Sequence, residues 1–145
     1  MQTFLPHADF RRCANVLDTK RLGKQRVEAL QILNAIALRN KGLKGGWVNH
    51  PVVIMWQDYI FALRFYMNCM IEEWISRGYK NTILLANVGR GYILPDWCGD
   101  NRLHSSHRAA LLIKNPSWYS QFGWTEQPKT EYFWPSKCED YMRGS

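Results

Sequence analysis

Apolar residues in the first forty positions recur at helical spacing rather than in strict alternation. The first set follows the i, i+3, i+4, i+7 rule and predicts a short helix beginning at Asp9: Phe10, Cys13, Ala14 and Leu17. A second helix is predicted to run from Asp18, a suitable N-cap, to about Arg39. The buried stripe expected along it consists of Leu22, Ala29, Leu33 and Ile36.

A third, longer helix is predicted to begin at Pro51, which suits a first helical turn, and to end at Gly78. Asn49 is its expected cap. Apolar side chains reach almost all round this helix, which is typical of an element at the centre of a core. They are Val52, Val53, Trp56, Ile60, Leu63, Met67, Met70 and Trp74.

The remaining segments are shorter. Residues 41–46 and 81–101 are rich in glycine and read as irregular connections. A short helix fits His104 to Ile113, Pro116 begins a further helical turn, and the tail from Gly123 has no clear period. Because few segments alternate with period two, we expect an all-α fold. We expect residues 1–145 to form a single domain built round the long central apolar helix.

The charge of the chain is concentrated near its beginning. The formal net charge is +7, and residues 1–44 hold nine lysines and arginines against three acids, which accounts for +6 of it. A local excess of this kind favours a polyanionic partner, with nucleic acid ahead of an anionic membrane surface. A membrane span is not expected, because four charges interrupt the apolar residues 52–75: Asp58, Arg64, Glu72 and Glu73.

The cysteines and histidines do not form an obvious metal motif. The four cysteines are far apart and are expected to be reduced thiols of an intracellular, cytoplasmic protein. They are Cys13, Cys69, Cys98 and Cys138. His104 and His107 have a spacing that zinc ligands use, and Cys98 lies nearby. No second pair at metal spacing accompanies them, so we expect no metal.

One face of the second helix joins cations to a single carboxylate. Arg21, Lys24 and Glu28 share this face, because helical residues three, four and seven apart are neighbours, and Gln25 lies beside them. An exposed helix often uses such a glutamate only for a modest pair with a lysine. The functional alternative is an acid that stabilises positive charge at C1′ of a bound nucleotide while its base departs.

Two later segments also suggest contact with nucleic acid. Residues 102–108 place cations, hydroxyl groups and imidazoles at a helix start, where free backbone N–H groups attract phosphate. The phosphate contacts expected there are Arg102, His104, Ser105, Ser106, His107 and Arg108, and the alternative for one of the histidines is a purely structural role. Further along, Lys114 precedes the adjacent aromatics Trp118 and Tyr119. One of these rings is expected to stack on a base or wedge a duplex, with core packing as the alternative.

In these strings the chain resembles the pyrimidine-dimer DNA glycosylase family, typified by phage endonuclease V, and is most similar to its cellular branch. The resemblance is carried by residues 1–6 (MQTFLP), 21–28 (RLGKQRVE), 46–51 (GWVNHP), 71–79 (IEEWISRGY), 102–108 (RLHSSHR) and 116–119 (PSWY). It covers nearly the whole chain. It implies a compact all-helical fold and a reaction on damaged duplex DNA without metal or organic cofactor.

The resemblance also implies a mechanism. An N-terminal amine attacks C1′, displaces the base and forms an imine, which permits β-elimination at the abasic site. An α-amine suits this role because a fraction of it is neutral at cellular pH. Aligning Arg26 and Val27 with the phage enzyme places Gly23 where that enzyme has its catalytic glutamate. Glu28 is the nearest substitute, with Asp18 next, and Lys24 is an alternative amine.

We therefore interpret the chain as a monomeric DNA glycosylase with AP-lyase activity on damaged double-stranded DNA, with cyclobutane pyrimidine dimers as the expected lesion. The alternatives are a glycosylase for another modified base and a non-catalytic module that binds DNA structure. The expected catalytic residues are Met1, Glu28, Arg21 and Lys24. The expected DNA-binding residues are Arg11, Arg12, Lys20, Gln25, Arg26, Arg102, His104, Ser105, His107, Arg108, Lys114, Trp118 and Tyr119.

Overall fold

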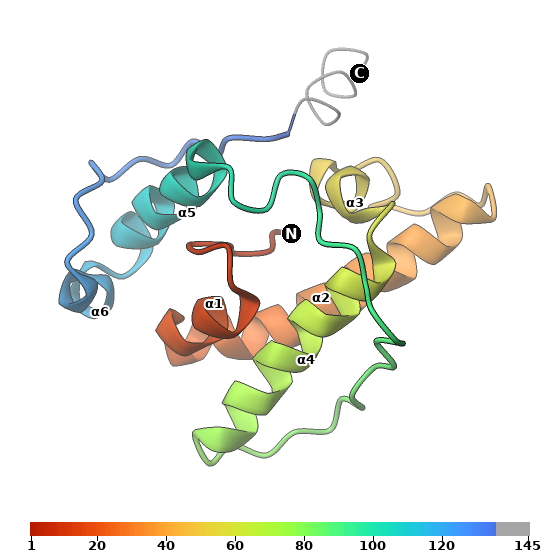
Figure 1. Cartoon of the computed structure of the whole chain (residues 1–145), viewed down its shortest axis with the longest axis horizontal. Coiled ribbons are helices and arrows are strands. Elements are labelled where there is room, and N and C mark those ends of the chain that lie inside the picture. The colour runs from red at the N-terminus through yellow and green to blue at the C-terminus, as the bar shows by residue number, and fades with distance from the viewer. Residues whose placement is uncertain (136–145) are drawn as a thin grey trace.

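The computed structural model describes residues 1–135, and the regular elements within that range are all helical (Figure 1). They are α1 (Phe10–Val16), α2 (Thr19–Asn40), α3 (Pro51–Trp56), α4 (Ile60–Ser76), α5 (Asn101–Lys114) and α6 (Pro116–Tyr119), followed by a 3₁₀ turn, η1 (Ser120–Phe122). The predicted all-α class is confirmed for this part of the chain.

The first two helices occur where the apolar spacing predicts them. Asp9 caps α1, since its Oδ1 accepts a hydrogen bond from the Arg12 backbone N–H at 3.0 Å. Asp18 occupies the N-cap position of α2 but makes no capping hydrogen bond. Its carboxylate instead pairs with the Arg21 guanidinium at 3.2 Å. Of the expected α2 stripe, Leu22, Ala29 and Ile36 are buried, and Leu33 is only partly so.

The long helix predicted from Pro51 to Gly78 is wrong as a single element. It is divided into α3 and α4 at residues 57–59, where Tyr59 leaves helical geometry with φ −132° and ψ 48°. His50 rather than Asn49 caps α3, because its Nδ1 accepts from the Val52 backbone N–H at 3.1 Å. The apolar pattern continues through the break because Trp56 and Leu63, on either side of it, are both fully buried.

Helix α2 packs along α4, and α5 lies on the other side of the N-terminal stretch (Figure 1). Residues 2–5 are buried between these helices. The core around them includes the fully buried rings of Trp56, Tyr66 and Tyr119. The beginning of the chain is thus an interior segment of the fold, and this placement builds the site described below.

The irregular segment expected between α4 and α5 is present, and α5 begins at Asn101, three residues before the expected start. Asp100 caps it by accepting from the Arg102 backbone N–H at 3.0 Å. Within residues 1–135 no helix combines the length and the apolar character that crossing a membrane requires. The cysteines in that range are free thiols, and Cys138 lies outside the described residues.

Candidate active site

The N-terminal tip is fastened to α2 by hydrogen bonds that its backbone makes with two side chains. The Gln2 backbone N–H donates to Glu28 Oε2 at 3.3 Å. Gln25 accepts from the Phe4 N–H through Oε1 at 2.9 Å and donates through Nε2 to the Gln2 carbonyl at 2.9 Å. Gln25 Nε2 also donates to Glu28 Oε2 at 3.0 Å. Because the Met1 amine is three bonds from the Gln2 nitrogen, the amine and the Glu28 carboxylate are held in one place.

The other side of the tip is held by α5 and α4. Leu5 donates its backbone N–H to His107 Nδ1 at 2.9 Å, and its carbonyl lies 2.7 Å from His104 Nδ1. The Tyr66 hydroxyl donates to the Phe4 carbonyl at 2.8 Å. Backbone groups that would be costly to bury without partners are therefore satisfied by side chains from three helices.

A cavity of about 290 Å³ lies against this tip. It is lined by Met1, Gln2, Phe4, Lys20, Arg21, Lys24, Gln25, Glu28, Lys114 and Tyr132. The lining contains four cationic side chains and a single carboxylate, that of Glu28, besides the amine of Met1. An anionic ligand is attracted to such a lining, and the lone acid lies where positive charge on the ligand would be stabilised. We call this cavity the cleft.

His50 lies close to the amine, at the beginning of α3. Burial lowers the pKa of its imidazole, and the positive charge of the N-terminal amine lowers it further. Its Nδ1 is occupied by the Val52 N–H. The neutral ring therefore carries its proton on Nε2, and its contribution near the amine is uncharged.

Gly23 and Arg26 lie on another face of α2, against α4. The Arg26 guanidinium stacks over the Trp74 ring at 4.3 Å and donates to Asn81 Oδ1 at 2.6 Å. A Cβ on Gly23 would lie 2.9 Å from the Trp74 ring, closer than van der Waals contact allows. Gly23 thus has no room for an acidic side chain, and Glu28 is the glutamate of α2 that reaches the tip.

Comparison with known families adds to the picture given by these contacts. The family model for pyrimidine dimer DNA glycosylase matches residues 1–87. The chain belongs to this family. Comparisons with curated proteins and with solved structures gave no match. The matched region of the glycosylase contains Met1, Lys20, Arg21, Lys24 and Glu28, and Lys114 and Tyr132 complete the cleft from outside it.

Of the residues that the sequence assigned to the glycosylase site, the cleft brings six together: Met1, Lys20, Arg21, Lys24, Glu28 and Lys114. Gln25 also lines it, but its side chain is buried and its amide is used on the tip. Its predicted role as a DNA contact is therefore corrected to one of positioning. Asp18, the second candidate acid, is buried between Arg21 and the Tyr119 hydroxyl.

The histidines of α5, which the sequence predicted as DNA contacts, face the interior of the fold. His104 and His107 are buried, and both rings face the backbone of Leu5. His104 Nε2 also accepts from the Gly99 N–H at 2.9 Å. Burial lowers the pKa of His107 to about 3, so this ring stays neutral and acts as an acceptor. The glycosylase uses both imidazoles to hold its N-terminal tip in place.

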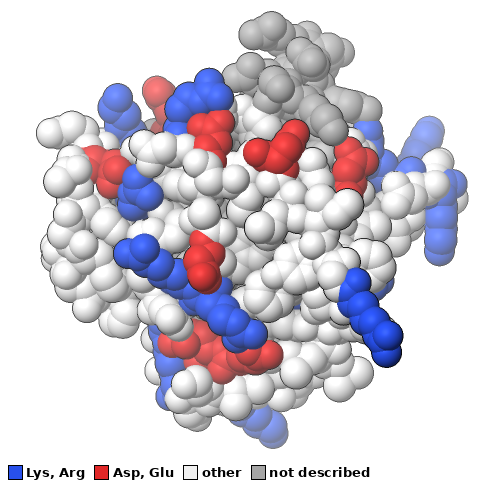
Figure 2. Space-filling view, viewed as in Figure 1, with Lys and Arg blue, Asp and Glu red and all other residues white. Residues whose placement is uncertain are grey.

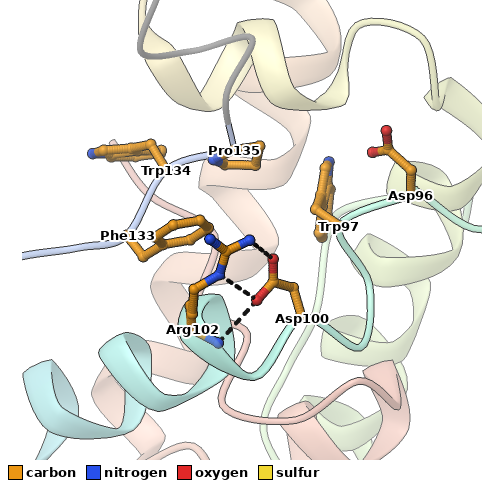
Figure 3. Close-up of a pocket in the computed structure, with 7 residues that line it drawn as sticks. All are labelled: Asp96, Trp97, Asp100, Arg102, Phe133, Trp134 and Pro135. Atoms are coloured by element: carbon orange, nitrogen blue, oxygen red, sulfur yellow. Dashed lines mark hydrogen bonds and ion pairs between the residues drawn. The ribbon is translucent and has the colours of Figure 1, made fainter.

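The cations expected to clamp phosphate on α5 are paired with acids. Arg102 forms two hydrogen bonds with Asp100, at 3.1 and 2.8 Å, and lies over the Phe133 ring at 4.6 Å (Figure 3). Arg108 donates to Glu126 at 3.0 Å and to the Pro6 carbonyl at 2.8 Å. Ser105 donates to the same glutamate at 3.1 Å. These side chains, predicted to bind phosphate, thus form a hydrogen-bonded network within the protein.

The aromatic pair on α6 is likewise structural. Trp118 donates its indole N–H to the Val16 carbonyl at 2.8 Å, and Tyr119 is fully buried with its hydroxyl on Asp18. Neither is placed to wedge a duplex. On α1, Arg11 pairs with Glu72 at 2.9 Å, away from the cleft lining, and Arg12 is exposed. The Arg26 guanidinium is stacked on the Trp74 ring and does not line the cleft.

Elsewhere on the surface, positive charge is mixed with negative charge. The face seen in Figure 2 shows lysines and arginines lying among carboxylates rather than as one continuous patch. This mixture agrees with the arginine–carboxylate pairs found within residues 1–135: Arg11–Glu72, Arg21–Asp18, Arg77–Glu73, Arg102–Asp100 and Arg108–Glu126. The cleft differs from this pattern because its cations outnumber its one acid.

Three residues near the amine were missed as site residues by the sequence: Gln2, His50 and Tyr132. Tyr132 was not recognised because the tail that carries it has no periodic pattern. Burial raises the pKa of the Tyr132 phenol. The charge of Arg21 lowers this pKa and the charge of Glu28 raises it, as expected for a ring that lines the same cleft as both. His50 offered one signal, since it precedes a proline at a helix start.

Proposed function

We propose that this member of the family is a DNA glycosylase with AP-lyase activity that excises cyclobutane pyrimidine dimers from duplex DNA through an imine on its N-terminal amine. The observation that carries the proposal is the tip held against α2. The Gln2 N–H lies 3.3 Å from Glu28 Oε2, in a cleft whose other charged side chains are cations. A nucleophile, an acid and a phosphate-attracting wall are thereby brought to one place.

The proposed reaction begins with attack of the neutral Met1 amine on C1′ of the damaged nucleotide. The C1′–N1 bond breaks, and N1 keeps the bonding electrons and takes up a proton, while the base stays joined to its neighbour through the cyclobutane ring. Loss of the remaining amine proton and opening of the sugar ring give the imine. Removal of a proton from C2′ then expels the 3′ phosphate, and water releases the amine. Glu28 stabilises the positive charge that develops at C1′.

The cations of the cleft have a separate role in this proposal. Lys20, Lys24, Arg21 and Lys114 line the opening and bind the phosphates that flank the lesion. Arg21 is oriented for this by Asp18, which holds its guanidinium at 3.2 Å. Extruding the damaged nucleotide costs a few kcal/mol, and less at a lesion that already weakens stacking. Lys24 is the alternative amine, because it lies in the same cleft.

The test is borohydride trapping on a duplex that carries either a thymine dimer or an abasic site. A covalent protein–DNA adduct is expected with both, and mass spectrometry of its peptides should locate the bond at Met1. An adduct on Lys24 would reassign the nucleophile. The absence of an adduct with either duplex would refute the lyase proposal and favour a module that binds DNA without chemistry. Trapping on the abasic site alone would indicate a different damaged base.

Glu28→Gln tests the role of the acid. An amide oxygen still accepts from the Gln2 N–H and from Gln25, so the tip keeps its place while the charge is lost. Turnover should fall by about 100- to 1000-fold, the usual effect of removing one electrostatic stabiliser, with little change in duplex affinity. The matched control is Glu72→Gln, an exposed glutamate paired with Arg11. Equal activity of the two variants would place the acid elsewhere.

A further inference from the structure

One tryptophan of the glycosylase is presented to solvent although the proposed chemistry gives it no task. The sequence suggested an aromatic wedge on α6, but the fold uses Trp118 and Tyr119 for its own hydrogen bonds. All seven tryptophans lie within residues 1–135, and among them only Trp47 is exposed, with 51% of its surface in solvent. A ring of this size gives up the stabilisation of burial, and it is free to contact a ligand.

The turn that carries Trp47 is fastened to the helices on both sides of it. The Trp47 carbonyl accepts a hydrogen bond from the His50 N–H, at the beginning of α3, at 3.0 Å. From α2, the Arg39 guanidinium donates to the Val48 carbonyl at 3.0 Å and to Asn49 Oδ1 at 2.8 Å. The exposed ring is therefore presented from a turn whose backbone is held in place.

A row of aromatic rings joins Trp47 to the cleft. The centre of the Trp47 ring lies 5.6 Å from that of His50, which in turn lies 6.4 Å from Trp134. Trp134 lies 6.1 Å from Tyr132, and Tyr132 lines the cleft. His50 is also close to the Met1 amine, whose positive charge lowers the pKa of the imidazole. Trp47 does not line the cleft itself, so it lies on the surface beside the place where the amine meets its substrate.

DNA that is held by the cleft must also cover this neighbouring surface. Three ring contacts of about 6 Å each separate Trp47 from Tyr132. With a rise of about 3.4 Å per base pair, that span corresponds to at most about five base pairs. A duplex whose damaged sugar reaches Met1 therefore continues over the surface at which the row of rings ends.

We infer that Trp47 is a wedge that enters the duplex at a base step beside the lesion and stacks on an intact neighbouring base. Apolar side chains that enter DNA do so between base steps, where they unstack the bases and kink the duplex. The two pyrimidines of a cyclobutane dimer are joined and are saturated at C5 and C6, so they offer no flat face to an indole. An intact base next to the dimer does offer one.

This inference rests on the proposed function, because it names what keeps the duplex open while the Met1 amine attacks the sugar. The wedge contacts a base and no phosphate, so it contributes to the deformation of the duplex and not to the salt dependence of binding. It acts on duplex DNA alone, since a single strand has no partner strand from which it must be separated.

The first measurement is the shape of the bound DNA. A short duplex with a central thymine dimer carries a donor dye at one end and an acceptor at the other, and a kink brings the dyes together. Binding of the wild-type protein should raise the energy transfer, and Trp47→Ala should lose most of this rise while its affinity keeps the same dependence on salt. Phe61→Ala is the matched control, since it removes a ring of similar exposure, 48%, at the start of α4. It should behave as the wild type.

The second measurement compares single-turnover rates on two substrates. On the duplex with the dimer, Trp47→Ala should slow base release about 5- to 100-fold, which is what one stack between a base and an aromatic ring is worth. Cleavage of a single-stranded oligonucleotide with an abasic site should be unchanged, because nothing has to be opened. Trp47→Phe keeps a smaller stacking face and should restore most of the rate on the duplex.

An equal loss on both substrates would show that Trp47 supports the amine through His50 and would overturn the wedge. No loss on either substrate would also overturn it and would leave the ring for a partner other than DNA. If the wild-type protein cleaves neither substrate, the proposed function fails, and the energy transfer still tests the wedge. A rise with the wild type that Trp47→Ala abolishes would support it, and equal transfer with both proteins would overturn it.

Discussion

Gln25 offers the sharpest test of how the tip is held, because one side chain makes all its hydrogen bonds inside the protein. In Gln25→Leu the apolar volume is nearly kept, but the Phe4 N–H and the Gln2 carbonyl lose their partners. Tyr66 and Glu28 also contact this amide, and each retains another partner: the Phe4 carbonyl and the Gln2 N–H. The cost therefore comes mainly from two orphaned backbone groups.

An unsatisfied buried polar group costs about 1–3 kcal/mol, so two of them predict a loss of about 2–6 kcal/mol in the free energy of unfolding. That is a large part of the roughly 5–15 kcal/mol that stabilises a typical domain. Urea denaturation followed by circular dichroism measures the loss directly. Gln31→Leu makes the same substitution on an exposed position of α2 and should change stability by less than about 0.5 kcal/mol.

Gln25→Glu separates the accepting from the donating half of the amide. A carboxylate still accepts from Phe4 and Tyr66, but it repels Glu28 and cannot donate to the Gln2 carbonyl. Its destabilisation should shrink as the pH enters the range in which carboxylates protonate. A Gln25→Leu protein as stable as Gln31→Leu would refute the reasoning, since the tip would then be held without this side chain.

Two further predictions concern acid stability and salt. Burial lowers the pKa of His107 from 6.5 to about 3, so between these values the unfolded chain binds a proton that the folded protein does not. The free energy of unfolding is therefore not reduced by His107 above pH 6.5, and it falls by about 1.4 kcal/mol per pH unit as the pH decreases below this value. His107→Asn should remove this pH dependence in urea titrations at several pH values. An unchanged slope would mean that another group carries the proton. Lys114→Gln should reduce the slope of log affinity against log salt by about one, as expected for one phosphate contact, whereas Lys44→Gln, on an exposed loop outside the cleft, should not.

The part of the site carried by one helix could be predicted from the sequence. Arg21, Lys24 and Glu28 share a face of α2 because their spacing is that of the helix itself, and the structure places all three on the cleft. The break between α3 and α4 could not be predicted, because the apolar pattern runs through residues 57–59 without a glycine or proline.

Several groups predicted to contact DNA have partners in the fold that lie far away in sequence. Leu5 and His107 are 102 positions apart, and Trp118 and Val16 are equally distant. Two adjacent aromatics on a short helix cannot face one core direction, but Trp118 and Tyr119 reach the end of α1 and the start of α2 separately. Local spacing holds no information about such distant partners. In the sequence, cations and rings that contact other parts of the protein therefore look the same as those that can contact a ligand.

The order in which the chain is made gives the attachment of Leu5 a biological meaning. Its N–H and its carbonyl contact the imidazoles of His107 and His104, which are synthesised about a hundred residues later. Until α5 has been synthesised, the apolar segment that contains Phe4 and Leu5 therefore lacks these two hydrogen-bond partners. Nascent chains that stop short of α5 lack both imidazoles, so they cannot fasten the tip in the way the folded protein does.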